Sequence, residues 1–330
     1  DAGIEAPELT ELRRFSWGTV LLVLGSIIGM WAIIGVLIDV AASFSTIKGA
    51  SWGWVAAVFV LSLFPPVVEA WGLVGSVFAG VPSRPVIILE FANDFTGLVG
   101  GTPATLAMTI RFFQKRGATS TYAVTAGALN SATSWIVKGV LFLVSIPLAI
   151  ASFNPGESGS GTHSGLVHLL LVLIIVVGVV AGIVGLVLTF ARRIRLMVAD
   201  KLRPLAAKAF EPVRNLARQP RRFAALVGGN LGSQLATALA LGASLHAFGQ
   251  HLSLAEIFFT ITIASMLGGV SPVPGGMGVV EAGMIAGLAG FGVPEDVAVA
   301  AVFVQRLFTA YLPPIWGYAA LLWLRRHDFL

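Results

Sequence analysis

The sequence has no cysteine and few charged residues, and both shortages exclude whole classes of protein. With no Cys among its 330 residues, the chain has no disulfides, no thiolate metal sites and no cysteine nucleophile. Asp, Glu, Lys and Arg make up 11% of the chain, against about 25% in ordinary soluble domains. With 56% hydrophobic residues and a mean hydropathy of +0.89, the chain lacks the polar surface that a water-soluble globule needs. We therefore exclude a soluble enzyme and predict a membrane protein that crosses the bilayer several times.

Long apolar runs divide the sequence into transmembrane segments. A helix needs about 20 residues to cross roughly 30 Å of hydrocarbon. Six uninterrupted runs reach that length, near residues 17–40, 52–78, 122–151, 166–190, 223–248 and 297–324. Two further runs, 86–110 and 254–291, are interrupted by Gly and Pro, which break helices, so neither is typical of a simple crossing.

The distribution of basic residues indicates how these two interrupted runs lie. Of the 21 Lys and Arg, all but Lys48, Lys138 and Arg306 reach one side of the membrane if both runs return to the side from which they enter. That arrangement satisfies the positive-inside rule, which places Lys and Arg in cytoplasmic segments. We therefore predict that both runs are re-entrant hairpins and that both chain ends are cytoplasmic.

The predicted elements form two units of opposite orientation. Residues 52–151 give a span, a hairpin and a span, and residues 223–324 repeat this order from the other side. The predicted fold is an all-α polytopic membrane protein with about six full transmembrane helices and two re-entrant helical hairpins in an inverted-topology repeat, forming one domain over residues 1–330. Segment 192–222 joins the halves, either as an amphipathic helix on anionic lipid headgroups or as a connector that fixes topology. The acidic start of the chain suggests a further region before Asp1.

The second interrupted run contains the motif SPVPGGMGVVE at residues 271–281. Its prolines are expected to end the incoming helix, and Gly275, Gly276 and Gly278 permit a tight turn before the next helix begins. The free N–H groups of that helix start favour a phosphate or a carboxylate. The alternative is that these glycines only permit close helix packing.

The first interrupted run has a comparable break, LVGGTP, at residues 98–103. Gly100 and Gly101 permit a bend, Thr102 can cap the following helix, and Pro103 suits its first position. A second helix start would then point inward from the opposite face of the membrane.

Charged residues at membrane depth are costly and are therefore functional candidates. Glu281, three residues after a helix start, either contributes to a binding site or caps its own helix. Arg306 either clamps a phosphate or pairs with Glu281 or Glu69. Lys138 is either a second headgroup ligand or a partner of Glu69. The other charged candidates, Glu90 and Asp94, either titrate or pair with the basic rim, and the polar neighbours of the whole set are Asn93, Asn130, Asn230, Gln234 and Gln305.

Residues 271–317 resemble the final part of the lysylphosphatidylglycerol synthase transmembrane region, the flippase-like membrane domain of multiple-peptide-resistance proteins and their stand-alone relatives. The resemblance rests on P-x-P-G-G-x-G-x-x-E, then G-V-P, then an arginine before a proline-containing last span. On this match Pro274, Gly275, Gly276, Gly278, Glu281 and Arg306 take the family's motif positions. Residues 91–117 resemble the first-half segment, but the break lacks the expected acidic residue and early arginine, since Arg111 comes later.

The resemblance implies lipid transport. We expect a flippase-like carrier in a bacterial cell membrane that moves an anionic, aminoacylated, polyprenyl or glycolipid between leaflets, with that lipid as its partner and no nucleic acid. A carrier or channel for a small water-soluble anion is the alternative, and a membrane-embedded enzyme on lipid-linked sugars is a third hypothesis. We expect no enzymatic activity, no cofactor and no metal, because the five His lack ligand spacing and no soluble domain follows Leu330 in this sequence. The predicted substrate-binding residues are Arg306, Glu281, Gly275, Gly276, Gly278, Pro274, Gly100, Gly101, Thr102, Asn93, Asp94, Lys138 and Glu69.

Overall fold

The computed structural model describes residues 44–76, 82–152, 219–270 and 276–330, and this part of the chain is helical. The helices are α2 (Phe44–Lys48), α3 (Trp52–Ser62), α4 (Phe64–Ser76), α5 (Ser83–Lys115), α6 (Ser120–Ser152), α9 (Pro220–Ala247), α10 (Leu254–Val270), α11 (Val279–Gly290), α12 (Glu295–Arg306), the π-helix η2 (Leu307–Tyr311) and α13 (Pro313–Arg326). The predicted all-α polytopic membrane protein is confirmed. The predicted spans 17–40 and 166–190 and nearly all of the connector 192–222 lie outside the described residues.

Four of the described helical segments are long and apolar enough to cross a membrane: Trp52–Ser76, Ala123–Ala149, Pro220–Ala247 and Glu295–Arg326. They coincide with four of the predicted spans. The first is interrupted at Leu63, directly before Pro65 and Pro66, because proline is accommodated in the first turn of a helix and not in its interior. The last is interrupted by η2, directly before Pro313 and Pro314.

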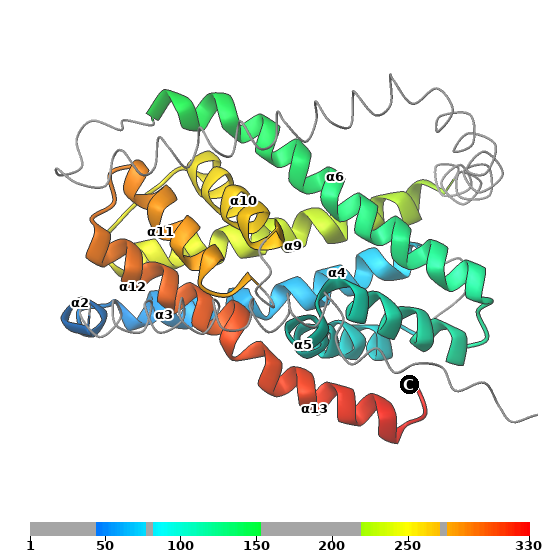
Figure 1. Ribbon diagram of the computed structural model, residues 1–330. Helices are drawn as coiled ribbons and strands as arrows, with labels where there is room; N and C mark the ends of the chain where they lie inside the picture. Colours follow the sequence, from blue (N-terminus) through cyan, green and yellow to red (C-terminus); the bar gives the residue numbers. More distant parts are fainter. Residues whose placement is uncertain (1–43, 77–81, 153–218, 271–275) are drawn as a thin grey trace, which may run out of the picture.

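Both interrupted runs fold into helical hairpins. Helix α5 bends at Gly101, and its two arms lie against each other. A hydrogen bond joins them, in which the Thr96 hydroxyl donates to the Met108 sulfur 3.3 Å away. Helices α10 and α11 form the second hairpin and pack closely along their length. Each hairpin begins and ends at the same end of the molecule, α5 at the end that carries the C-terminus and α10–α11 at the opposite end (Figure 1).

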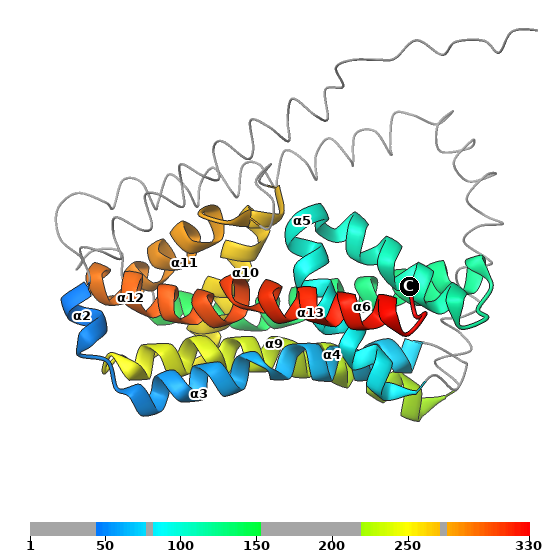
Figure 2. The same ribbon diagram turned by 90° about the horizontal axis from the view of Figure 1, so that it is seen from below.

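The two units pack crosswise around a shared pair of spans. The α3–α4 span lies along α9. The last span of the second unit packs on the α5 hairpin through α13. The last span of the first unit, α6, packs on α10 of the second hairpin. Figure 2 shows α3, α4 and α9 as one layer, with α12 and α13 above it and both hairpins beyond. In both views the bend of α5, the end of α10 and the start of α11 approach one another near the middle of the molecule.

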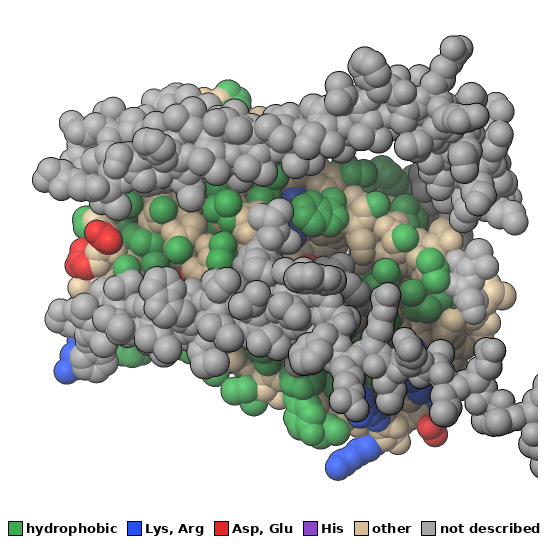
Figure 3. Space-filling view, viewed as in Figure 1, with side chains coloured by type: hydrophobic (Ala, Val, Ile, Leu, Met, Phe, Trp, Pro, Cys, Tyr) green, Lys and Arg blue, Asp and Glu red, His purple; other side chains and the backbone are tan. Residues whose placement is uncertain are grey.

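The surface matches a protein surrounded by lipid. Among the described side chains seen in Figure 3, hydrophobic ones are spread over the middle of the face, and the Lys, Arg, Asp and Glu side chains lie mainly towards its ends. Helix α6 carries a continuous exposed apolar patch, which is typical of a surface that faces lipid or a partner: Trp135, Ile136, Val140, Leu143, Val144 and Leu148. Basic residues gather at the end where α5 begins and ends, α9 begins and α13 ends: Arg84, Arg111, Lys115, Arg116, Arg221, Arg222, Arg325 and Arg326.

The closest helix packing in the described part joins α4 to α9 through glycine. A Cβ added at Gly75 would lie 2.7 Å from the Leu226 backbone nitrogen, and one added at Gly229 would lie 2.5 Å from the Gly72 nitrogen. Without an aqueous hydrophobic drive between them, membrane helices gain stability by such close backbone approach. These glycines fix the shared pair of spans on which both hairpins rest.

Candidate functional site

The start of α11 is a turn that depends on glycine. Gly276 and Gly278 have φ of 64° and 81°, in the left-handed region that favours glycine. Gly276 also lies directly against α10, because an added Cβ would be 2.8 Å from the Gly268 Cα. The predicted helix start near Gly278 is confirmed, and the two other motif positions, Pro274 and Gly275, lie outside the described residues.

Glu281 is fully buried and accepts three hydrogen bonds. Its Oε2 accepts the Gly278 backbone N–H at 2.6 Å, and its Oε1 accepts the Arg306 Nε–H at 2.6 Å and the Tyr311 hydroxyl at 2.8 Å. Capping of its own helix, one alternative for Glu281, and pairing with Glu281, one alternative for Arg306, therefore occur together. This carboxylate ties the start of α11 to the α12–η2 junction.

Tyr311 is a partner that sequence reasoning missed. Residues five apart lie about 140° apart around an α-helix, so Arg306 and Tyr311 would not face the same group. The intervening turn is a π-helix, in which the Leu312 N–H donates to the Leu307 carbonyl at 2.9 Å. The wider turn brings both side chains to Glu281, and such insertions are frequent at functional sites. The signal in the sequence was Pro313–Pro314, which removes two N–H donors from the α-helical pattern.

Glu281 already engages positive groups that an anion could bind at the start of α11. The charge of Arg306 is matched by Glu281, and one of the backbone N–H groups that the sequence assigned to a ligand already donates to the same carboxylate. The Arg306 side chain is 14% exposed, so it is the accessible member of the pair. A phosphate or carboxylate that reaches this site must compete with Glu281 for it.

The first hairpin bends at a single residue of the predicted break. Gly101 has φ 64° and ψ −164°, a region that is essentially restricted to glycine, whereas Gly97 and Gly100 lie in the helical arm before it. Gly97 has a different role: a Cβ there would lie 3.3 Å from Thr105 Cγ2, so its hydrogen lets the second arm pack closely. The second arm begins directly after Gly101, as predicted, and the side chain of Thr102 lies outside the described residues.

Replacing Gly101 by Ala is expected to lower the free energy of unfolding by about 1–3 kcal/mol, because a Cβ is strained at this φ and ψ. Unfolding by dodecyl sulfate in mixed micelles measures the change. Gly139→Ala is the matched control, since Gly139 lies inside α6 without a positive φ and an added Cβ would meet nothing within 4 Å. Equal losses in both variants would contradict a special role for the bend.

A second group of polar residues joins α4, α5, α6 and α9. Glu69 Oε1 accepts the Ser233 hydroxyl at 2.5 Å, and the Asn93 amide donates to Glu90 at 2.9 Å. Glu69 and Asp94 both act electrostatically on Glu90, so three acidic residues lie near one another. The Asn230 amide donates to the Asn130 oxygen at 3.0 Å, and a Cβ at Gly72 would press on both side chains.

Lys138 and Arg306 belong to different groups. Lys138 attracts Glu69 at longer range, without an ion pair within 4 Å in the described part of the chain. Arg306 pairs with Glu281 and not with Glu69.

Two buried acceptors, Asn93 Oδ1 and Gln305 Oε1, have no hydrogen-bond partner among the described residues and suit a hydroxyl or ammonium donor.

One comparison with known proteins finds a relationship. The profile of the family described as "Lysylphosphatidylglycerol synthase TM region" matches residues 14–317, which is nearly the whole chain. No curated protein matches the sequence.

Proposed function

Because the chain belongs to the lysylphosphatidylglycerol synthase transmembrane region family, we propose that it moves a lipid between the two leaflets of a membrane. The cargo is an anionic, aminoacylated, polyprenyl or glycolipid. Its headgroup passes near mid-membrane while its tails stay in the bilayer. The protein acts as a carrier and makes or breaks no bond in the lipid.

The opposed hairpins are the observation that carries this proposal. The α5 hairpin and the α10–α11 hairpin start from opposite ends of the molecule and turn back near its middle. Non-helical backbone at membrane depth is tolerated only where protein or a water-filled cavity surrounds it. Inverted repeats with broken helices near the midplane are typical of alternating-access carriers. We infer that both hairpins are re-entrant and that the two units form an inverted repeat.

The charged residues at membrane depth suit a headgroup that carries both signs. Glu69, Glu90 and Asp94 attract an ammonium or hydroxyl group, and Lys138 and the accessible side of Arg306 attract a phosphate. Charges at this depth are costly, and in membrane proteins such residues commonly mark a substrate pathway. Asn93, Gly100, Gly101, Thr102 and the motif residues Pro274, Gly275, Gly276 and Gly278 remain predicted substrate contacts on this proposal.

The basic end of the molecule gives the proposed orientation. Both ends of α5, the start of α9 and the end of α13 carry Lys or Arg at this end, whereas the start of α12 at the other end carries Glu295 and Asp296. Under the positive-inside rule this end is cytoplasmic, and both chain ends are expected there too. The basic segment 192–222 is proposed to meet anionic headgroups on the same side.

Translocation in liposomes tests the proposal. The full chain is reconstituted with headgroup-labelled phosphatidylglycerol, and an impermeant reductant bleaches the label in the outer leaflet. We expect protein-dependent bleaching of label that protein-free liposomes protect. Uptake of chloride and inorganic phosphate is measured in parallel. If no anionic, aminoacylated or polyprenyl lipid moves while a soluble anion is taken up, the carrier for soluble anions replaces this proposal.

Lys138→Gln is expected to slow lipid translocation about tenfold, which corresponds to roughly 1.4 kcal/mol of lost attraction for the phosphate. Lys115→Gln is the matched control, because it removes the same charge at the exposed end of α5. The initial bleaching rate gives the comparison. Equal rates in Lys138→Gln and wild type would remove Lys138 from the pathway.

A further inference from the structure

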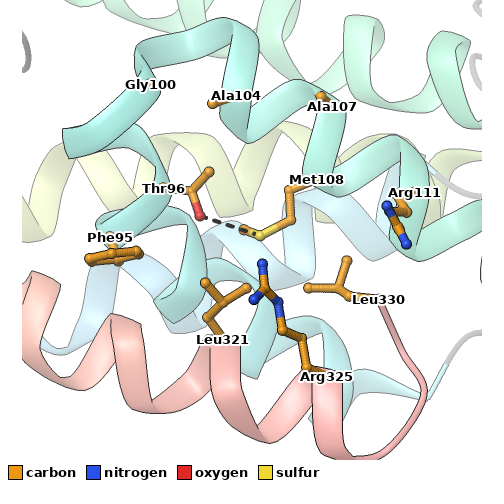
Figure 4. Close-up of a pocket in the computed structure, with 10 residues that line it drawn as sticks. All are labelled: Phe95, Thr96, Gly100, Ala104, Ala107, Met108, Arg111, Leu321, Arg325 and Leu330. Atoms are coloured by element: carbon orange, nitrogen blue, oxygen red, sulfur yellow. Dashed lines mark hydrogen bonds between the residues drawn. The ribbon is translucent and has the colours of Figure 1, made fainter.

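A cavity of about 570 Å³ lies between the two arms of α5 and the end of α13 (Figure 4). Its walls are mainly apolar, with Phe95, Met108, Leu321 and Leu330 among them. The Thr96 hydroxyl is engaged with the Ala92 carbonyl and the Met108 sulfur, so it offers little to a ligand. Volumes of this size are typical of sites that enclose a small molecule or part of a larger one.

Two guanidinium groups line the cavity, Arg111 from the second arm of α5 and Arg325 from the last turn of α13. In Figure 4 the Arg325 side chain points between the arms of α5 and ends near Met108, and Arg111 lies at the edge of the cavity, beyond Leu330. No acidic residue lines the cavity, and neither arginine has an ion-pair partner within the residues that the structure describes. Guanidinium is permanently charged and binds phosphate oxygens bidentately, so the pair is complementary to a phosphate.

The cavity also has the direction and length of one lipid leaflet. It extends from Arg111 and Arg325 at the basic end towards Gly100, next to the bend of α5. From Arg111 back to Gly100 the helix rises about 16 Å at 1.5 Å per residue, roughly half of the 30 Å hydrocarbon thickness. A phosphate at headgroup level would therefore continue into an apolar space that reaches about mid-membrane depth.

We propose that this cavity binds one anionic phospholipid, with its phosphate between Arg111 and Arg325 and an acyl chain along the apolar walls towards Gly100. The site is separate from the Glu281–Arg306 pair. Its occupation does not depend on transport, since a lipid can bind here whether or not the protein moves lipid between leaflets. A free phosphate would share the arginines but would gain nothing from the apolar walls, which is the reason for assigning a lipid.

Native mass spectrometry of the full chain in mixed micelles tests this site. Phosphatidylglycerol and phosphatidylcholine compete for binding, and wild type is expected to retain one phosphatidylglycerol preferentially. The double variant Arg111→Gln/Arg325→Gln is expected to weaken that binding at least tenfold. The matched control is Lys115→Gln/Arg326→Gln, which removes the same charge from the same helix ends outside the cavity lining. An equal loss in the control would mean diffuse attraction by the basic end and would overturn the site.

A third variant separates a lipid from a free phosphate. Ala107 lines the cavity and is exposed, so Ala107→Trp is expected to fill the apolar space with little strain on the helix. It should weaken phosphatidylglycerol binding several-fold while calorimetry shows unchanged binding of inorganic phosphate. If phosphatidylglycerol binds Ala107→Trp as it binds wild type, or if inorganic phosphate binds as tightly as the lipid, the acyl-chain assignment is wrong. Circular dichroism confirms that each variant remains folded.

Discussion

Replacing Glu281 by Ala is expected to lower the free energy of unfolding by about 3–5 kcal/mol, which is the cost of leaving a buried charge without its partner. Glu281 is fully buried, and it accepts hydrogen bonds from the Arg306 Nε, the Tyr311 hydroxyl and the Gly278 N–H. The substitution leaves all three donors without this acceptor. Unfolding by dodecyl sulfate in mixed micelles, followed by tryptophan fluorescence, measures the change.

A double-mutant cycle isolates the ion pair from the rest of this loss. Arg306→Ala should cost a comparable amount, because it leaves the buried carboxylate without its cation, whereas Glu281→Ala/Arg306→Ala should cost clearly less than the sum of the two. Tyr311→Phe is the graded control, since it removes one hydrogen bond to a charged group and should cost about 1.5–3 kcal/mol. Strictly additive losses for Glu281 and Arg306 would show that the pair is not energetically coupled.

Replacing Gly229 by Ala is expected to destabilise the protein by about 3 kcal/mol or more, through overpacking between α4 and α9. An added Cβ at Gly229 would meet backbone atoms, among them the Gly72 nitrogen at 2.5 Å, and backbone cannot rotate out of the way as a side chain can. The two helices must move apart, and contacts along the rest of their interface loosen with them. The same dodecyl sulfate titration gives the loss.

The adjacent residue provides the control. An added Cβ at Gly228 meets nothing within 4 Å, so Gly228→Ala should be neutral or stabilise the helix by up to about 1 kcal/mol. The two variants differ only in which of two neighbouring glycines gains a methyl group. If both lose stability equally, the close approach of α4 and α9 is not what stabilises this region.

Hydropathy and charge alone predicted much of the fold. The four described spans coincide with predicted runs, because a helix in lipid must be apolar over about 20 residues whatever its neighbours are. Both interrupted runs also form helical hairpins, and their re-entrance into the membrane stays a proposal that the basic residues support. The bend itself was less well defined, since Gly97, Gly100 and Gly101 look alike in the sequence and only Gly101 leaves helical geometry.

The candidate site was predicted only in part. Glu281 and Arg306 were identified because charge at membrane depth is costly, but the sequence left open whether they bind a substrate or serve the structure, Glu281 by capping its helix and Arg306 by pairing with Glu281 or Glu69. Tyr311 was missed because a regular helix places it away from Arg306, and the π-helix that reverses this is a local response to two prolines. Arg111 and Arg325 lie more than 200 positions apart, so no local pattern relates them.

By itself, the sequence determined that this protein lies in a membrane, which of its runs are long and apolar enough to cross, which runs are interrupted by Gly and Pro, and where its basic residues gather. These properties depend on composition and on neighbours along the chain, and lipid imposes them on each segment separately. The tertiary structure decided which side chains meet, Glu281 with Arg306 and Tyr311 and Glu69 with Ser233, and it placed Arg111 and Arg325 in the lining of one cavity. Such meetings depend on how one helix packs on another, and single bends and glycine contacts set that packing at positions remote in sequence.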